Sequence, residues 1–496
     1  MTHMSRTFGA AAILVAAWVA LSVAGCTTVE EIRTHHGTDT DLPVVDAADP
    51  TKGCNFGGVT QPARANSIED YGDHWAGFVE FDDEGWHYQV PGEPSQMEVV
   101  QKRLRQELAD PNFDQADFVV VAFIHGWHHN AHDDDCNVHE FRAILKVANE
   151  RYAELFKRGT LAHARRIVGI YAGWRGESVN ATGLRVATVI DRRNAAERVA
   201  KGDVRELFAL IRRAQFEQTL RPKPRADRMR TIVIGHSFGG LVAFHGLSPA
   251  LLNELTLTKP DQSLGCEPVL RRASTVLLDK TAGLTPAVGA AQVRPNTPAF
   301  PDMTVLINPA FESTRFEALH QLMRPVSGCP YPKDTPKLIV VTADNDYATG
   351  GLFTAERKFL TLLETYPSGV AAARQANERE ANVHAIGFVD RYLTHRLCLT
   401  PPVPGTAQRA VAALTPPTNP DWPDSDKYAP VWVVRAPPQI VNSHDGFFYA
   451  EPDSSGKRVP YLLNWLISMH AEGPKPGSLA MTADNACPLS GVQVAP

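Results

Sequence analysis

Residues 231–244 read Thr231-Ile-Val-Ile-Gly-His-Ser-Phe-Gly-Gly-Leu-Val-Ala-Phe244 and contain the most specific pattern in the chain. A short apolar run ends at Gly235, Ser237 follows, and an apolar segment typical of a helix begins after Gly240. Residues 235–239 fit the pattern Gly-x-Ser-x-Gly, in which a tight turn from strand to helix exposes the serine. Glycine is favoured on both sides because a side chain there would collide with the strand or the helix. The stretch therefore predicts a strand, a turn carrying a reactive serine, and a helix.

Buried strand patterns alternate with helical patterns on both sides of this stretch. Continuous apolar runs are typical of strands buried on both faces of a parallel sheet, and they occur at residues 118–124, 303–307 and 338–342. Shorter strand patterns lie at 166–171 and 431–435, and helical spacing occurs at 97–108, 141–155, 192–214, 353–363 and 461–469. Residues 66–95 favour one or two antiparallel edge strands, and residues 383–392 fit either a strand or a helix. The order indicates an α/β fold with a mainly parallel sheet.

Composition limits the class of partner. A chain of 496 residues with 44% hydrophobic content can bury a large core. The formal net charge is −6, and lysine and arginine are scattered rather than clustered. We therefore expect no nucleic-acid partner.

The first 26 residues predict a lipoprotein signal peptide. Arg6 supplies a minimal charge, residues 8–21 are almost wholly apolar, and Val23-Ala-Gly-Cys26 closes the segment with small residues. The apolar part is shorter than a comfortable membrane span with its flanks. The closing residues resemble a bacterial lipobox, which implies lipidation of Cys26 and attachment to the periplasmic or surface face of the cell envelope. An ordinary signal peptide or an uncleaved anchor is the alternative.

The remaining chain divides by composition. Residues 27–65 are polar and predict a flexible tether, residues 66–472 a single α/β domain, and residues 473–496 a tail. Within the domain, residues 253–301 predict a lid-like insertion over the carboxyl edge of the sheet, where ligands bind. Residues 400–430 predict a Pro-rich loop.

Six cysteines remain once Cys26 is assigned to lipid. An even number in an exported chain predicts disulfides among Cys54, Cys136, Cys266, Cys329, Cys398 and Cys487. Pairing of neighbours, such as Cys266 with Cys329, is one of many possible connectivities, and the sequence does not choose among them. None of the six has the spacing of a zinc site.

A serine needs a base to take its proton, and that base needs an orienting carboxylate. After a strand-to-helix elbow the acid comes next in the chain and the histidine last. Asp344 and Asp346 follow the strand at 338–342. We favour Asp346, because Ala343 allows a turn and about three further residues return the carboxylate towards the serine. Asp344 stays open as the alternative.

His444 is the predicted base, since it lies between the last strand and the last helix and precedes an Asp-Gly turn. Competing histidines in helical or strand patterns are more typical of packed or solvated side chains, and these are His384, His395 and His470.

Negative charge that develops on oxygen during acyl transfer requires backbone donors already in place. One is the N–H of Phe238, after the serine, and the other is that of Trp127, in the loop where Gly126 permits close backbone approach. His128, His129 and the run Asp133-Asp134-Asp135 also lie in this loop. Acidic runs ahead of a helix typically cap it, so we expect no metal at this loop. We also expect no cofactor.

The elbow, the His-Gly-Trp loop at 125–127, Asp346 and His444 together resemble the α/β-hydrolase superfamily, and most of all bacterial esterases with an HGW-type oxyanion loop. The resemblance covers roughly residues 115–470 and rests on four short motifs. It implies Ser237 as nucleophile, Asp346 as acid, His444 as base, and the amides of Trp127 and Phe238 as oxyanion donors. Residues 253–301 and 400–430 depart from the family pattern.

The resulting hypothesis is an exported, lipid-anchored serine hydrolase that cleaves carboxylic esters with an apolar group through an acyl-enzyme. Lipases, thioesterases, acyltransferases and peptidases use the same machinery, so the substrate stays open. A non-catalytic surface lipoprotein with a hydrolase-like fold is the alternative from another class, and a metal-dependent hydrolase using the loop at 128–135 is a third. The sequence leaves the oligomeric state undetermined.

Overall fold

The structure is a computed structural model. It describes residues 30–42, 45, 52–55, 66–177, 188–221, 228–268, 300–324, 329, 331, 335–366, 371–400, 411–415, 429–448 and 459–472. The predicted signal peptide with Cys26, most of the predicted tether and the predicted tail at 473–496 lie outside these residues. Within the described part of the chain, no helix is both long and apolar enough to cross a bilayer.

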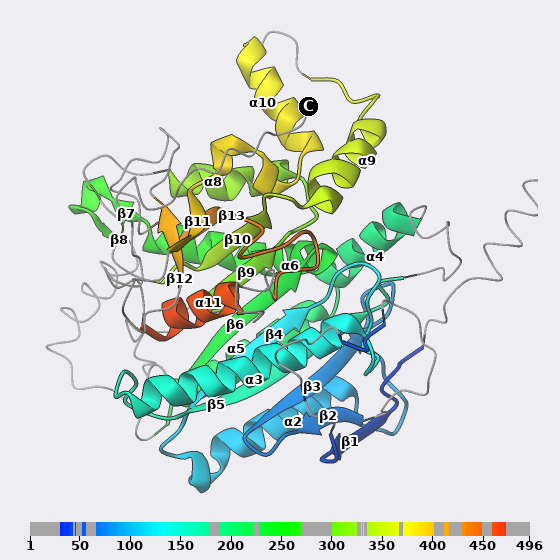
Figure 1. Cartoon of the computed structure of the whole chain (residues 1–496), viewed down its shortest axis with the longest axis vertical. Coiled ribbons are helices and arrows are strands. Elements are labelled where there is room, and N and C mark those ends of the chain that lie inside the picture. The colour runs from blue at the N-terminus through cyan, green and yellow to red at the C-terminus, as the bar shows by residue number, and fades with distance from the viewer. Residues whose placement is uncertain are drawn as a thin grey trace, which may run out of the picture.

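An 11-stranded sheet forms the centre of the molecule (Figure 1). Its strands lie side by side in the order β1-β2-β3-β5-β4-β6-β9-β10-β13-β11-β12. Neighbouring strands run parallel from β3 through to β11, whereas β2 is antiparallel to β3 and β12 to β11. The strands are β1 (His35–Asp39), β2 (Asn66–Asp70), β3 (His74–Phe81), β4 (Asp117–Ile124), β5 (Arg165–Trp174), β6 (Met229–His236), β9 (Met303–Ile307), β10 (Leu338–Ala343), β11 (His395–Thr400), β12 (Val411–Thr415) and β13 (Val431–Ala436).

Helices cover both faces of the sheet, as the predicted α/β class requires. The helices are α2 (Gln96–Ala109), α3 (Cys136–Lys157), α4 (Val189–Lys201), α5 (Val204–Thr219), α6 (Phe238–Thr258), α8 (Glu317–Met323), α9 (Phe353–Leu360), α10 (Ala372–Val383) and α11 (Tyr461–Glu472). α3 and α11 pack on one face, and α2, α4, α5, α6 and α8 pack on the other (Figure 1).

The apolar run of β4 explains why two layers of helices are needed. Successive side chains of a strand point to opposite faces, so a strand without polar positions must be covered twice. Phe118, Val120 and Ala122 lie in the core beneath α5 and α6, and Val119, Val121 and Phe123 lie in the core beneath α3. Full burial of each of the valine and phenylalanine side chains contributes roughly 1.5–3 kcal/mol.

The edge of the sheet differs from the prediction. β2 and β3 are antiparallel, but neither lies at the edge, since β3 also pairs with β5 and β2 also pairs with β1. The edge strand is therefore β1, which lies in the stretch predicted to be a flexible tether. The reason is Arg33, which is fully buried although it lies in a mainly polar stretch. Its Nη1 lies 2.9 Å from Oε1 of Glu69, and its Nε donates to the carbonyl of Ala131. A buried arginine with these partners holds residues 30–39 against the domain.

The single helix predicted at 192–214 is two helices, α4 and α5, separated at Gly202. A side-chain carbon at Gly202 would lie 2.3 Å from the carbonyl oxygen of Gly85, so only glycine allows the two segments to meet. The adjacent N–H of Asp203 donates to that same carbonyl. This tertiary contact overrides the helical periodicity of the sequence.

Three further segments refine the prediction. α6 extends to Thr258 and a short hairpin of β7 (Pro260–Asp261) and β8 (Glu267–Pro268) follows, while residues 269–299 of the predicted insertion lie outside the described part. β12 occupies part of the predicted Pro-rich loop. The ambiguous segment 383–392 holds the end of α10 and two 3-10 turns, Ile386–Phe388 and Asp390–Tyr392.

Two disulfides join the described residues, Cys54–Cys136 and Cys266–Cys329. The second is the neighbour pairing that the sequence left as one possibility. Cys398 is also disulfide-bonded, and Cys487 lies outside the described residues.

Candidate active site

Ser237 lies on a strained turn between β6 and α6. Its backbone has φ 54° and ψ −120°, an unfavourable conformation for a residue with a side chain. Its N–H donates to the carbonyl of Ile307, and its own carbonyl accepts from Gly240 and Leu241. A side-chain carbon at Gly239 would lie 2.1 Å from the carbonyl oxygen of Ile124, which explains the glycine after the serine. The elbow predicted from the sequence is therefore present in the backbone.

The structure brings Ser237, His444 and Asp346 together from three separate loops. Nε2 of His444 lies 2.9 Å from Oγ of Ser237. Nδ1 of His444 lies 3.0 Å from each carboxylate oxygen of Asp346. Asp346 is buried, and it also accepts from the backbone N–H and the hydroxyl of Thr349. The arrangement allows a proton to pass from the serine to the histidine.

The alternative residues weighed from the sequence lie elsewhere. The carboxylate of Asp344 faces Arg396, with Oδ1 and Nη1 3.5 Å apart. His384 contacts Thr354, His395 contacts Thr394, and His470 contacts Tyr152. None of these contacts involves Ser237.

The pKa shifts of Asp346 and His444 are those expected for a basic histidine oriented by a carboxylate. Burial raises the pKa of Asp346, but the hydrogen bond and charge of His444 and the bonds from Thr349 outweigh it, so the net pKa is below the ordinary value. Burial lowers the pKa of His444, but the hydrogen bond and charge of Asp346 and the charge of Asp445 outweigh it and leave the pKa above 6.5. Asp346 is thus ionised and favours the protonated imidazole.

The loop at 125–127 approaches the serine closely. A side-chain carbon at Gly126 would lie 2.8 Å from Cβ of Ser237, so glycine is required at this contact. The N–H of Gly126 faces Oδ1 of Asn137 at 3.4 Å. Among the described residues, no acceptor engages the N–H of Trp127 or of Phe238. Phe238 also begins the 21-residue helix α6, whose positive end favours negative charge nearby.

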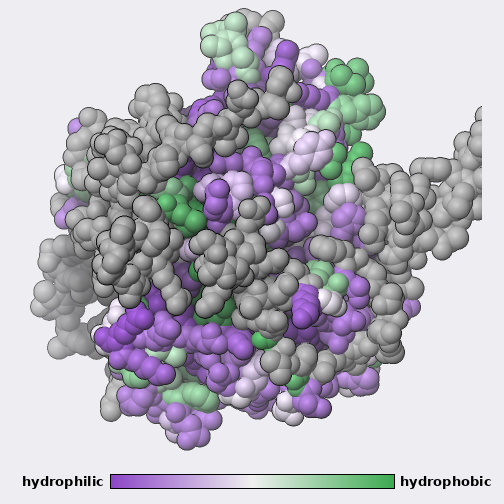
Figure 2. Space-filling view, in the orientation of Figure 1, coloured by the Kyte–Doolittle hydropathy of each residue, from purple (hydrophilic) through white to green (hydrophobic). Residues whose placement is uncertain are grey.

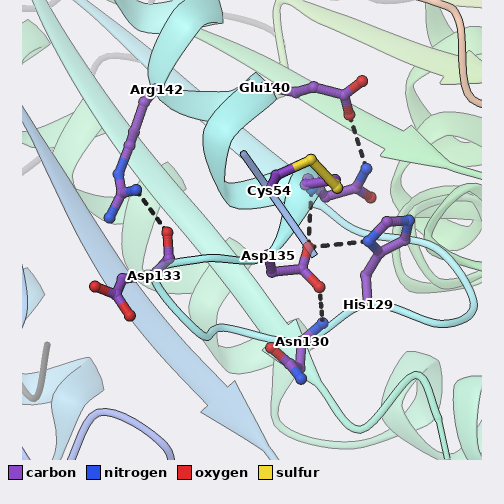
Figure 3. Close-up of a disulfide and its surroundings, with 9 residues drawn as sticks. Cys54, His129, Asn130, Asp133, Asp135, Glu140 and Arg142 are labelled. Atoms are coloured by element: carbon purple, nitrogen blue, oxygen red, sulfur yellow. Dashed lines mark hydrogen bonds and ion pairs between the residues drawn. A yellow bond between two sulfur atoms is a disulfide. The ribbon is translucent and has the colours of Figure 1, made fainter. Parts of the chain in front are cut away.

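Asp135 organises the rest of this loop, beside the Cys54–Cys136 disulfide (Figure 3). Its carboxylate accepts from Nδ1 of His129 at 2.9 Å, from the N–H of Asn130 at 3.2 Å, and from the N–H of Asn137 at 2.8 Å. The last contact makes Asp135 the N-cap of α3, as the acidic run predicts.

His/Asp groups close enough to share an ion occur outside the run at 128–135. Among the described residues they are His236 with His444 and Asp445, and His87 with Asp203 and Glu206. The first group includes the histidine that already contacts Ser237 and Asp346.

A cavity of about 390 Å³ opens beside Ser237. Its surface is mainly apolar. The lining residues are Trp127, His128, His129, Val189, Ser237, Phe238, Ala310, Ala348, Thr349, Leu352, Phe353, Glu356, His444 and Asp445. α9 supplies part of one wall. Phe359 near the end of α9, and Leu362 and Leu363 just after it, are largely exposed. Figure 2 shows apolar surface at the corner where Figure 1 places α9.

Three residues at the site were not predicted from the sequence. Asp445 raises the pKa of His444, whereas its place in an Asp-Gly sequence indicates only a turn. His236 donates from Nε2 to the carbonyl of His444, and Asn308 donates to the same carbonyl. The position of His236 inside the elbow motif could have indicated that it lies at the site. The position of Asn308 after a strand could not, because asparagine is common in turns.

Comparisons with known proteins leave the family open. No protein-family model and no curated protein matches the chain. Among solved structures, the chain is similar to an uncharacterized protein from Pseudomonas aeruginosa, at 10% identity and a TM-score of 0.22. The match covers 82% of this chain and 53% of the other, so the chain spans about half the length of that protein. A similarity of this size supports no assignment of family or activity.

Proposed function

We propose that this protein is an exported serine hydrolase of the α/β-hydrolase type that cleaves carboxylic esters through an acyl-enzyme on Ser237. One observation carries the proposal: the hydrogen-bonded series Ser237–His444–Asp346, of which Ser237 and His444 line a mainly apolar cavity. The three side chains follow in the chain order expected for this fold. The parallel sheet with helices on both faces is compatible with it.

The first half of the reaction forms the acyl-enzyme. Oγ of Ser237 attacks the ester carbonyl carbon while Nε2 of His444 accepts the hydroxyl proton. The carbonyl oxygen gains the negative charge, and the N–H groups of Trp127 and Phe238 are the donors available to it. The tetrahedral intermediate then expels the alkoxide, which takes the proton from His444 and leaves as an alcohol.

The second half returns the free serine. Water attacks the acyl carbon while His444 accepts one of its protons, and the resulting intermediate expels Oγ of Ser237. His444 returns the proton to Oγ, and the carboxylic acid leaves. Asp346 orients His444 and stabilises its charged form in both halves.

The cavity supports an ester with an apolar acyl or alcohol group. Phe238, Leu352 and Phe353 line the wall, and burial of a methylene group against such side chains contributes about 0.8 kcal/mol. Phe359, Leu362 and Leu363, at the end of α9 and just after it, add exposed apolar side chains to the same segment of the chain. We further propose export and a lipid anchor at Cys26; the two disulfides support export, since they persist in oxidising compartments.

A fluorophosphonate probe tests the proposal. Such probes react covalently with an activated serine, so we expect wild-type protein to be labelled at neutral pH and Ser237→Ala to be unlabelled. Labelling should persist after exhaustive chelation, which separates the proposal from a metal-dependent hydrolase. Absence of wild-type labelling, or equal labelling of Ser237→Ala, would instead favour a non-catalytic protein with this fold.

The pH profile should report the pKa of His444. Only neutral His444 can accept the proton of Ser237, so kcat/KM should fall as the pH drops through a pKa that lies above 6.5. Asp445 contributes to that raised pKa, so Asp445→Asn should move the acidic limb to lower pH. The exposed Asp390 pairs with Arg435, away from the cavity lining, and Asp390→Asn serves as the control. An acidic limb that Asp445→Asn leaves in place would contradict the contribution of Asp445 to the pKa of His444.

A further inference from the structure

We propose that Asn308 is a positioning residue that joins the loops of Asp346 and His444 behind Ser237. The inference rests on the proposed function, since it concerns how the three reacting groups are held. Asn308 is fully buried directly after β9 and does not line the cavity.

The side chain of Asn308 connects two loops that are distant in sequence. Its Oδ1 accepts from the backbone N–H of Ala343 at 2.9 Å, at the end of the strand that leads to Asp346. Its Nδ2 donates to the carbonyl of Ser443 at 3.0 Å and to the carbonyl of His444 at 2.7 Å. All three of these hydrogen bonds go to backbone groups of the two segments that carry the acid and the base.

The backbone around Asn308 provides the third connection. The N–H of Asn308 donates to the carbonyl of Val341 in β10. The preceding residue, Ile307, accepts the N–H of Ser237 through its carbonyl at 3.0 Å. One dipeptide at the end of β9 thus contacts the nucleophile turn, the acid strand and, through the amide, the base loop.

Asparagine meets the requirements of this position. The backbone has φ 45°, in the left-handed region, which asparagine tolerates better than most residues with a side chain. The orientation of the amide is fixed, because two carbonyl oxygens face one end and an N–H faces the other. Aspartate would turn an acceptor towards both carbonyls, and glycine would keep the backbone but remove all three side-chain bonds.

The carbonyl of His444 is the point on which the contacts converge. It accepts from Nδ2 of Asn308 and also from Nε2 of His236, at 3.0 Å. Two donors on one carbonyl restrict the position of the residue, and the imidazole of His444 must reach Ser237 and Asp346 at the same time. Removing one donor lets the imidazole move, and a displacement of about 1 Å costs roughly 100-fold in rate.

The test compares Asn308→Asp and Asn308→Gly with a matched buried amide. Gln215 is equally buried and donates to the carbonyl of Met229 and to Asp302, near the start of β6 and far along that strand from Ser237. Gln215→Glu makes the same chemical change as Asn308→Asp. Asn308→Gly keeps the left-handed backbone and replaces Asn308→Asp if the latter does not fold.

The measurements are kcat and KM for an ester, the melting temperature, and the deshielded imidazole proton of the His444–Asp346 bond in proton NMR spectra. That resonance is identified by its absence in His444→Ala. We expect both Asn308 variants to lose about 100-fold in kcat with KM unchanged, and to lose or shift the resonance. Gln215→Glu should keep both kcat and the resonance at a comparable loss of melting temperature.

The outcomes separate the two proposals. If wild-type protein is labelled by fluorophosphonate but the Asn308 variants keep kcat and the resonance, the role of Asn308 is wrong and the hydrolase proposal stands. If wild-type protein is not labelled, the hydrolase proposal fails, and the NMR comparison of the Asn308 variants with Gln215→Glu still decides whether Asn308 holds His444 against Asp346.

Discussion

Replacing Ser237 with alanine should lower kcat for ester hydrolysis by about 10⁴- to 10⁶-fold, and His444→Ala should cause a loss of similar size. The hydroxyl of Ser237 is a weak nucleophile, and His444 lies 2.9 Å away as the base that activates it. The double variant should be no slower than either single variant. Losses that act through one shared step do not add, because the second substitution removes a group that no longer has a partner.

Initial rates on a short-chain ester, with active-site titration of the wild type, would measure these losses. Ser248 is further along α6, where its hydroxyl bonds to the carbonyl of Phe244, so Ser248→Ala controls for loss of a hydroxyl from the same helix. His384→Ala controls for loss of a partly buried imidazole. Additive losses in the double variant, or substantial hydrolysis by Ser237→Ala, would mean that Ser237 and His444 do not act together.

Asp346→Asn should lower kcat by about 10⁴-fold, whereas Asp344→Asn should leave kcat close to that of the wild type. The carboxylate of Asp346 accepts the Nδ1 proton of His444 and keeps Nε2 free to receive the proton of Ser237. An amide can present a donor there instead, which favours the wrong tautomer. It also removes the negative charge that stabilises the imidazolium formed during the reaction.

Asp344→Asn is the control for Asp346→Asn, because the two aspartates are close in sequence but have different surroundings. Asp344 is two residues earlier, and its carboxylate faces Arg396 rather than the histidine. Loss of such a partly exposed ion pair typically costs about 1 kcal/mol of stability or less. Parallel measurements of kcat and melting temperature would separate a catalytic loss from a folding defect. A large loss in Asp344→Asn together with an active Asp346→Asn would reverse the assignment of the acid.

Much of the architecture could be predicted because it is encoded in neighbouring residues. The apolar run of β4 requires cover on both faces, and the elbow requires glycine beside Ser237; both are local demands visible in a short window. The helical spacing of apolar residues also predicts both ends of α2 to within one residue and the start of α11 at Tyr461, although α11 continues to Glu472.

Predictions were wrong where a distant contact decides the local structure. The polar residues before β1 read as a tether, but Arg33 is buried against Glu69, 36 positions later in the numbering. The helix expected at 192–214 breaks because the carbonyl of Gly85 meets Gly202. In each case the residue that determines the local structure is too far away in the sequence to affect the local pattern of apolar residues.

The α/β class and the turn that carries Ser237 follow from the sequence, which also favours His444 as base and Asp346 as acid over the neighbouring alternatives. The contacts of His444 with Ser237 and Asp346, and the role of Asn308 in joining the two loops, are visible only in the folded chain. The physical reason is separation along the chain. Ser237 and His444 are 207 residues apart, and only the register of β6, β9, β10 and β13 in one parallel sheet brings their loops to the same edge.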